Sequence, residues 1–346
     1  MESAIPEHLK TARTRHRRVP DDYAPPYPSF VARHKPSVAR VVMAYFGVQT
    51  SAAALSKGAE QALGWIVSRF GLQGGPTHWD QARYVDEAGF TNIVTVAYWD
   101  DRKKFDGWFP AARDGWTGEA RATDGAGTFI EVLCPSVEGY ETLFSSLGRP
   151  EGVAVLADAL SGEVQEHAYW GGMRDRIPLS QTSEMAPSGA ARTVRDGVCI
   201  RVIPHDNLCL IRSGQDWGDT EASERKMYLD DVEPVLREGM DFLRDDGRAI
   251  GCYANRYMTV IASDGAATEK SYGMSWWKSL AALERWAESH PTHVRIFGAA
   301  MKYLSTLGPA AKLRLYHEVT VVRSDDALFE YAGCHPKTGM LNAVQA

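Results

Sequence analysis

Two adjacent segments near the C-terminal end of the chain differ in hydrophobic periodicity. In the first, apolar side chains recur at helical spacing from Pro291 onward; Pro291 suits the first helical turn, with Ser289 as the predicted N-cap. Gly308 and Pro309 end this helix. In the second, residues 313–322, apolar and polar side chains alternate, which is typical of a strand. The pattern therefore predicts a helix followed by a strand.

Each of these segments carries one histidine on an otherwise apolar face. His293 shares its helical face with Phe297, and His317 shares its strand face with Leu315. One interpretation is a pair of core histidines whose ring nitrogens bond to the backbone. The other is a buried planar cofactor with one histidine below it and one above it. Haem fits this second interpretation because its iron takes an axial imidazole. Periodicity alone leaves both open.

The first 38 residues are predicted to form an extended N-terminal arm. The run from Arg13 to Arg18 is basic, and the stretch from Pro20 to Pro28 contains too much proline to be helical. A basic run can bind nucleic acid, but a net charge of −6 argues against nucleic acid as a partner. We expect the arm to lie across the protein surface or to contact a second copy of the chain.

The following segment, residues 39–145, predicts the order β-α-β-β-α-β of a ferredoxin-like unit. Thr50 or Ser51 is the expected N-cap of its first helix. The expected strands are 39–48, 82–85, 91–99 and 129–134, and the expected helices are 51–70 and 101–109.

Residues 197–333 repeat this order, and residues 146–196 bridge the two halves. A strand at 198–211, a helix at 221–243 and a strand pair across Asp264 and Gly265 are expected before two further helices and the 313–322 strand. Residues 334–346 form a C-terminal tail. A duplication is supported by three aromatic or apolar positions of matching spacing in the halves: Trp99, Phe105 and Trp108, against Trp277, Leu283 and Trp286.

Composition narrows the class of protein. Hydrophobic residues make up 44% and charged residues 24% of the 346 residues, which is typical of a soluble globular protein. No apolar run reaches membrane length, and the N-terminal residues contain no secretory hydrophobic region. The five cysteines are odd in number and lack CxxC spacing, so we expect a reduced cytoplasmic protein without a membrane partner.

Several short motifs, each weak alone, form a specific set together. They include YETL (140–143), MRDR (173–176), RSGQDW (212–217), SHPTH (289–293) and LYHEV (315–319). The set runs from the N-terminal residues to Cys334, His335 and Pro336. It resembles the aldoxime dehydratases, haem b enzymes that convert aldoximes into nitriles and water. The resemblance implies two ferredoxin-like halves joined into one β-barrel flanked by helices, with the haem buried in the second half. It also implies an α+β fold and a homodimer.

The resemblance assigns roles to four residues. His293 would bind the haem iron on the proximal side. On the distal side His317 would act as general acid and then as base, while Ser213 and Arg176 would hold the oxime hydroxyl. The active haem would be ferrous, with the oxime bound through its nitrogen. Without the resemblance, Ser213 fits a turn, and Arg176 fits a surface ion pair with Asp175 or another carboxylate.

Three further residues stay open at this point. The resemblance places Glu141 near the site with a redox or proton-relay role, whereas its local sequence is typical of a solvated helix. His167 either supports the distal side or packs beside Tyr169 and Trp170. Cys134 is an alternative iron ligand, but a thiolate suits oxygen activation better than a dehydration. A haem peroxidase of related fold and a haem carrier are the alternative functions.

Overall fold

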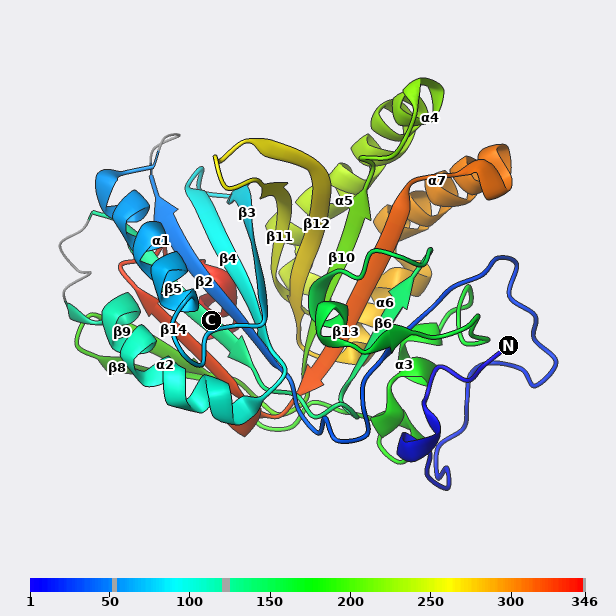
Figure 1. Cartoon of the computed structure of the whole chain (residues 1–346), viewed down its shortest axis with the longest axis horizontal. Helices are drawn as coiled ribbons and strands as arrows, with labels where there is room; N and C mark the ends of the chain where they lie inside the picture. Colours follow the sequence, from blue (N-terminus) through cyan, green and yellow to red (C-terminus); the bar gives the residue numbers. More distant parts are fainter. Residues whose placement is uncertain (52–54, 120–124, 345–346) are drawn as a thin grey trace.

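Twelve strands form one antiparallel sheet that runs through the whole computed structural model (Figure 1). The structure describes residues 1–51, 55–119 and 125–344. The strand order is β6-β13-β10-β12-β11-β3-β4-β2-β5-β14-β9-β8, and a separate pair is formed by β1 (Ala32–Arg33) and β7 (Ala159–Leu160). The fold is therefore α+β, as the sequence predicts.

The first half supplies four central strands and two helices. These are β2 (Val42–Thr50), α1 (Lys57–Phe70), β3 (His78–Val85), β4 (Thr91–Trp99), α2 (Arg102–Thr117) and β5 (Gly127–Leu133). Every residue of β2, β4 and β5 is buried. Both faces of these strands are covered, because α1 and α2 pack on one side and the second half of the sheet lies on the other. This explains why their sequences are apolar without alternation.

The second half repeats the order of elements. It contains β10 (Leu208–Asp216), α4 (Ala222–Met227), a π-helical turn (Tyr228–Val232), α5 (Glu233–Asp245), β11 (Cys252–Ile261), β12 (Ala267–Trp277), α6 (Leu280–Ser289), α7 (Pro291–Leu307) and β13 (Arg314–Val322). Helices α5 to α7 cover the outer face of this half (Figure 1). The halves join where β11 pairs with β3.

Additional short elements extend the sheet at both ends. They are β6 (Tyr140–Phe144) at one end and β14 (Ala327–Ala332), β9 (Cys199–Ile203) and β8 (Arg192–Asp196) at the other. The short helix α3 (Gly172–Arg176) lies outside the sheet. Short 3-10 turns occur at Glu7–Leu9, Gly152–Leu156, Pro178–Gln181, Gly247–Ile250, Gly308–Ala310, Ser324–Asp326 and Gly339–Val344.

The predicted closed β-barrel is wrong. Strands β6 and β8 are the two ends of the sheet and do not pair with each other. The free edge of β6 is occupied by the N-terminal arm, because Phe30 and Phe144 exchange two backbone hydrogen bonds of 2.8 and 2.9 Å. Strand β8 is exposed along its whole length and ends the sheet on the other side. An edge that is already paired with the arm cannot close a barrel.

Several predicted element boundaries also differ from the structure. Thr50 ends β2, and α1 begins at Lys57 after Ser56, whose hydroxyl accepts from the Ala59 amide; part of the predicted helix, residues 52–54, lies outside the described residues. The predicted strand 198–211 is divided at Pro204, which lacks a ladder donor.

Two helix ends are also corrected. Ser289 is the last residue of α6, and His290 caps α7 with its side chain. Helix α2 continues through Pro110 to Thr117, beyond the predicted end at residue 109.

The space between the halves is filled by an apolar core that contains buried ion pairs. Glu131 accepts two hydrogen bonds from Arg256, of 2.5 and 2.6 Å. Glu318 accepts from the Val153 amide at 2.6 Å and from the Tyr98 hydroxyl at 3.1 Å. The interior between the halves therefore contains polar as well as apolar side chains: Glu131 is paired with Arg256, whereas Glu318 is held by neutral donors.

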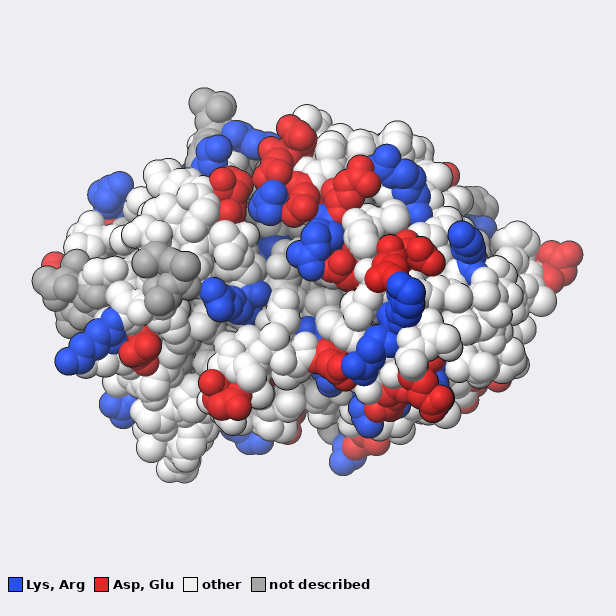
Figure 2. All heavy atoms as spheres, turned by 90° about the horizontal axis from the view of Figure 1, so that it is seen from above, with Lys and Arg blue, Asp and Glu red and all other residues white. Residues whose placement is uncertain are grey.

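The outer surface mixes both signs of charge. Figure 2 shows acidic and basic side chains interspersed around a hollow near the middle of one face. Within the described ranges, none of the helices combines the length and apolar character that crossing a membrane would need.

Candidate functional site

A cavity of about 500 Å³ lies between the sheet and the helices of the second half. Strands β10, β12 and β13 form one wall, helices α5 to α7 form the other, and the segment before and within α3 lies at one side. The lining is mainly apolar and includes Leu143, Ile211, Leu236, Met240, Ile296 and Phe297. A cavity of this kind suits a bulky apolar group held by a few polar side chains.

The sheet wall is built from residues that lie directly opposite one another on neighbouring strands. His317 on β13 pairs in register with Ser213 on β10 and with Leu143 on β6. Ser213 in turn lies opposite Gly273 on β12. Directly opposite side chains have Cβ atoms about 5 Å apart, so the strand register alone brings His317 and Ser213 together. All four residues line the cavity.

Arg176 connects two other predicted site residues, Glu141 and His317. Its Nε and Nη2 donate to Glu141 at 2.6 and 3.0 Å, and its Nη2 lies 2.8 Å from His317 Nε2. Its Nη1 donates to the Glu166 carbonyl at 2.7 Å. The side chains of Arg176 and Glu141 are 3% and 1% exposed. Arg176 is therefore part of a buried cluster: it does pair with a carboxylate, Glu141, but the alternative of an ion pair at the surface is wrong.

His317 has a hydrogen-bond partner in both of its protonation states. Its Nε2 lies 2.8 Å from Arg176 Nη2, a donor, and 3.0 Å from Glu141 Oε1, an acceptor. Unprotonated Nε2 can accept from Arg176, and protonated Nε2 can donate to Glu141. This is the arrangement that a side chain needs if it is to release a proton and later take one up.

Glu141 lies on strand β6 and is buried, so the alternative of a solvated helix residue is wrong. Burial acts to raise its pKa, but Arg176 and His317 outweigh burial and the net pKa is lowered. The carboxylate therefore stays ionised and balances the charge of Arg176.

His167 is almost completely buried, and neither ring nitrogen has a hydrogen-bond partner within the described part of the chain. Its ring packs against Tyr27 at 5.2 Å. Burial and then the charge of Arg176 lower the pKa of His167 to about 4. The ring is thus packed and neutral, with no hydrogen bond to the described residues of the Arg176 cluster, but its aromatic partner is Tyr27 and not the predicted Tyr169 or Trp170.

His293 faces the same cavity from the helix wall. Helix α7 begins at Pro291, where a missing N–H has no cost, so His293 lies in the first turn. Its ring contacts Trp286 at 4.6 Å and Trp170 at 6.0 Å. Burial lowers the pKa of His293 to about 4, although the backbone of Ala287 acts in the opposite direction. The imidazole is therefore neutral, which is the form that binds iron.

These residues fit a haem. A neutral imidazole lies on one wall and a polar group of His317, Ser213 and Arg176 lies on the other, with apolar side chains between them. The buried Nδ1 of His293 has no hydrogen-bond partner among the described residues. Cys134 does not fit, because it lies in the core of the first half and burial raises the pKa of its thiol to about 12.

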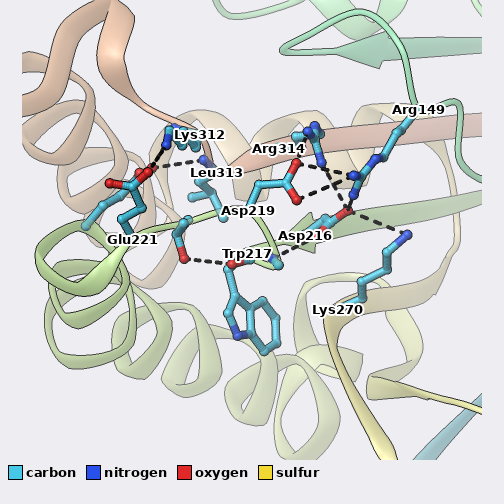
Figure 3. A network of polar contacts seen from close by, with 12 residues as sticks. Arg149, Asp216, Trp217, Asp219, Glu221, Lys270, Lys312, Leu313 and Arg314 are labelled. Atoms are coloured by element: carbon cyan, nitrogen blue, oxygen red, sulfur yellow. Dashed lines mark hydrogen bonds and ion pairs between the residues drawn. The ribbon is translucent and has the colours of Figure 1, made fainter.

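A charged network fixes the end of β10, three residues beyond Ser213. Figure 3 shows Asp216 between Arg149, Lys270 and Arg314, with carboxylate-to-cation distances of 3.6 to 3.7 Å. The backbone amide of Trp217 donates to the Glu269 carbonyl at 3.0 Å. The network ties three strands and the loop of Arg149 together. Ser213 itself lies within strand β10, so the alternative that it is a turn residue is wrong.

Sequence reasoning missed the contacts that assemble this cluster. The Glu166 carbonyl that holds Arg176 and the glycine opposite Ser213 gave no signal in the sequence pattern. Strand β6, which carries Glu141, has five residues and was not predicted. Cross-strand register would have found Gly273, but register requires knowledge of which strands are neighbours.

Comparison with known proteins agrees with this geometry. The profile of the haem-containing dehydratase family matches residues 44–340. The aliphatic aldoxime dehydratase of Pseudomonas chlororaphis is 47% identical over 99% of this chain and 98% of its own length. The phenylacetaldoxime dehydratase of Bacillus sp. (strain OxB-1) is 33% identical over 94% of each chain.

Solved structures give the same answer for the fold. A crystal structure of an aldoxime dehydratase superposes with a TM-score of 0.95 at 45% identity, covering 100% of this chain and 99% of that one. A second, in complex with butyraldoxime, has a TM-score of 0.95 at 46% identity and covers 100% and 97%. The chain therefore belongs to the haem-containing dehydratase family, and within it to the aldoxime dehydratases.

Proposed function

We propose that this enzyme dehydrates aldoximes to nitriles on a ferrous haem b held by His293, with His317 as general acid and then base. The observation that carries the proposal is the buried cluster of His317, Arg176 and Glu141, which faces His293 across an apolar cavity. His293 would hold the haem, which in its ferrous state would supply electron density for breaking the N–O bond of the oxime.

His317 handles both protons of the reaction. Its protonated Nε2 gives a proton to the departing hydroxyl, so that the N–O bond breaks with release of water. The neutral ring then takes the proton from the adjacent C–H carbon, and the electron pair of that bond completes the C≡N triple bond. The ring returns to its starting state, and no external acid or base is consumed.

Arg176 and Ser213 position the hydroxyl. Arg176 has five N–H donors, and four of them contact Glu141, Glu166 and His317. One Nη1–H is left for the substrate, which makes the guanidinium a rigid donor because the other contacts fix its plane. Ser213 lies directly opposite His317 and supplies a second hydroxyl contact.

Glu141 and His167 act through this cluster. Glu141 stabilises the cationic form of His317 and fixes Arg176, an electrostatic role that needs neither a redox change nor a proton relay through the carboxylate. His167 stays neutral and packs against Tyr27, and it directly follows Glu166, whose carbonyl holds Arg176.

Aliphatic aldoximes are the proposed substrates. The cavity lining is mainly aliphatic around the polar cluster, and the Pseudomonas chlororaphis relative carries the name aliphatic aldoxime dehydratase. The butyraldoxime complex of a 46% identical protein supports a short alkyl substrate. Relative kcat/KM values for butyraldoxime and phenylacetaldoxime test this, and a preference for the aromatic substrate contradicts it.

The domain organisation follows the same proposal. We infer two ferredoxin-like halves, 39–145 and 197–333, joined by a bridge at 146–196 and flanked by the arm at 1–38 and the tail at 334–346. The order β3-β4-β2-β5 in one half and β11-β12-β10-β13 in the other supports a duplication. The second half carries His293. Five free cysteines support a reducing, cytoplasmic location, and sedimentation tests the proposed homodimer.

The experiment that tests the proposal compares two histidine variants. H293A loses the axial bond and should purify with little haem, whereas H317A should keep a full haem complement with a five-coordinate ferrous spectrum. H317A should still bind aldoxime spectroscopically and form almost no nitrile. Loss of haem from H317A but not from H293A would reverse the two assignments.

The redox state is tested separately. Nitrile formation should require a reductant such as dithionite, because nitrogen coordination needs ferrous iron. Equal rates for the air-oxidised and the reduced enzyme would contradict the ferrous assignment.

A further inference from the structure

The N-terminal arm is fixed to the segment that borders the haem cavity. The amides of Arg18 and Val19 donate to Asp175 Oδ2 at 2.8 and 2.9 Å. The hydroxyl of Tyr23 donates to the carbonyls of His167 and Ala168 at 3.0 and 2.9 Å. These contacts join parts of the chain about 150 residues apart in sequence, at buried or half-buried positions. The basic run of the arm therefore has a defined place beside the cavity.

The side chain of Arg18 lies at the cavity mouth. A Cβ atom added to Gly171 would come within 2.2 Å of Arg18 Cδ, so the arginine stem rests directly on this glycine. Gly171 has a φ of +99° and lines the cavity, and its neighbour Trp170 lines the cavity while remaining 39% exposed. Arg18 is therefore next to the place where the cavity opens to solvent.

The charge of Arg18 is not matched by a close carboxylate. Its nearest recorded acidic partner is Glu284, with Nη2 4.0 Å from Oε2, beyond hydrogen-bond distance. Glu284 also lines the cavity, but Arg174 already binds it through Nε at 3.0 and 3.2 Å and Nη2 at 2.6 Å. Arg174 also lies 3.9 Å from Glu184, which Arg15 contacts at 3.2 Å, so three guanidinium groups share two carboxylates and one positive charge is unmatched at the mouth.

Haem b brings its own negative charge to such a cavity. Its ring is apolar, but one edge carries two carboxylate groups, and an unpaired carboxylate is costly to bury. Among the described residues, the only lining cation is Arg176, which is committed to Glu141 and the distal cluster. The carboxylate edge therefore belongs at the mouth, beside a guanidinium that can bind it bidentately.

We propose that Arg18 of the N-terminal arm pairs with a haem carboxylate and so retains the cofactor. This inference rests on the haem part of the proposed function and is independent of the roles of His317, Ser213 and Arg176. It gives Arg18, the last residue of the basic run, a specific role, while the contacts of the arm agree with the expected strap across the surface and the dimer contact stays a prediction.

The test measures haem release to excess apomyoglobin from the intact holoenzyme. R18Q should release haem about three- to tenfold faster than the wild type, as expected for a half-exposed charged pair. R18K should release haem at an intermediate rate, because lysine keeps the positive charge but cannot bind a carboxylate through two parallel N–H groups. R15Q is the matched control: Arg15 is on the same arm, equally exposed, and paired with Glu184 at 3.2 Å, so its release rate should be unchanged.

A second part of the experiment removes the negative charge from the cofactor. Haem dimethyl ester lacks both carboxylates, so the wild type and R18Q should release it at the same rate, and the wild type should release it faster than haem b. Increasing salt should accelerate release of haem b only. The ester comparison in the wild type holds even if a variant folds poorly.

The outcomes separate the two proposals. Equal release of haem b from R18Q and the wild type, or an equal effect of R18Q on haem b and the ester, would overturn the role of Arg18. Absence of nitrile formation with normal haem release would instead count against the catalytic assignments.

Discussion

The buried pair of Glu141 and Arg176 gives the sharpest test of the site. E141Q keeps the shape of the side chain and removes its charge, which leaves a guanidinium that is 3% exposed without a counter-ion. Breaking a buried pair on one side costs about 3–5 kcal/mol of folding free energy. Because the pair has two hydrogen bonds of 2.6 and 3.0 Å, we expect a loss in that range.

The same change should slow the reaction. In E141Q the cationic form of His317 loses the carboxylate that lies 3.0 Å from its Nε2, and Arg176 loses the contact that fixes its plane. Loss of one charged hydrogen bond is worth about 1.5–3 kcal/mol, which corresponds to a fall in kcat of about 10- to 100-fold. Nitrile formation by the dithionite-reduced enzyme measures kcat, and urea unfolding measures the stability.

The chain offers a matched control for this variant. Glu131 and Arg256 form a second buried pair, with hydrogen bonds of 2.5 and 2.6 Å and side chains 0% and 2% exposed, and neither residue lines the cavity. E131Q should lose similar stability while kcat stays within about twofold. If E131Q and E141Q lowered kcat equally, or if E141Q left it unchanged, the catalytic reasoning would be refuted.

Three further predictions follow from particular residues. S213A should keep its haem spectrum and lose at least about tenfold in kcat, measured as nitrile formed per haem. G152A should lose at least about 2 kcal/mol in urea unfolding, because a Cβ at φ +61° would also meet the Glu318 carboxylate at 2.2 Å, whereas G189A, at φ +85° with open space around it, should lose only the backbone cost of about 1 kcal/mol. Burial lowers the pKa of His34 to about 4, so below pH 6.5 the unfolded chain takes up a proton that the folded chain does not. Between pH 6.5 and 5 the wild type should therefore lose about 2 kcal/mol more of its free energy of unfolding than H34F. Equal losses in the two proteins would contradict the burial argument.

Local periodicity was sufficient for the elements that carry the two histidines. Helix α7 and strand β13 were predicted because each has a long, regular pattern and a clear end signal. The apolar faces of His293 and His317 were predicted for the same reason. Periodicity does not decide whether the two histidines face each other across one cavity; that expectation comes from the family resemblance of the motif set.

Other features depend on contacts that are distant in sequence. Glu141 lies in a five-residue strand whose partner is 178 residues later, so its local sequence could not distinguish a buried from a solvated carboxylate. The barrel was wrong because sheet closure is decided at the edges, and the edge of β6 is taken by Phe30 of the arm. The place of the arm was equally invisible, since Asp175 binds it across more than 150 residues.

Neighbouring residues of β13 face different compartments. His317 points into the cavity, while Glu318 points between the halves and accepts from Tyr98 of β4 and the Val153 amide. The first half lends few side chains to the cavity, yet it holds the strand that positions the reacting imidazole. The sensitivity of activity to substitution should therefore not decline simply with distance from the cavity. Substitutions on β4 and β13 are expected to be epistatic, because the hydrogen bond between Tyr98 and Glu318 links the strand that carries His317 to β4.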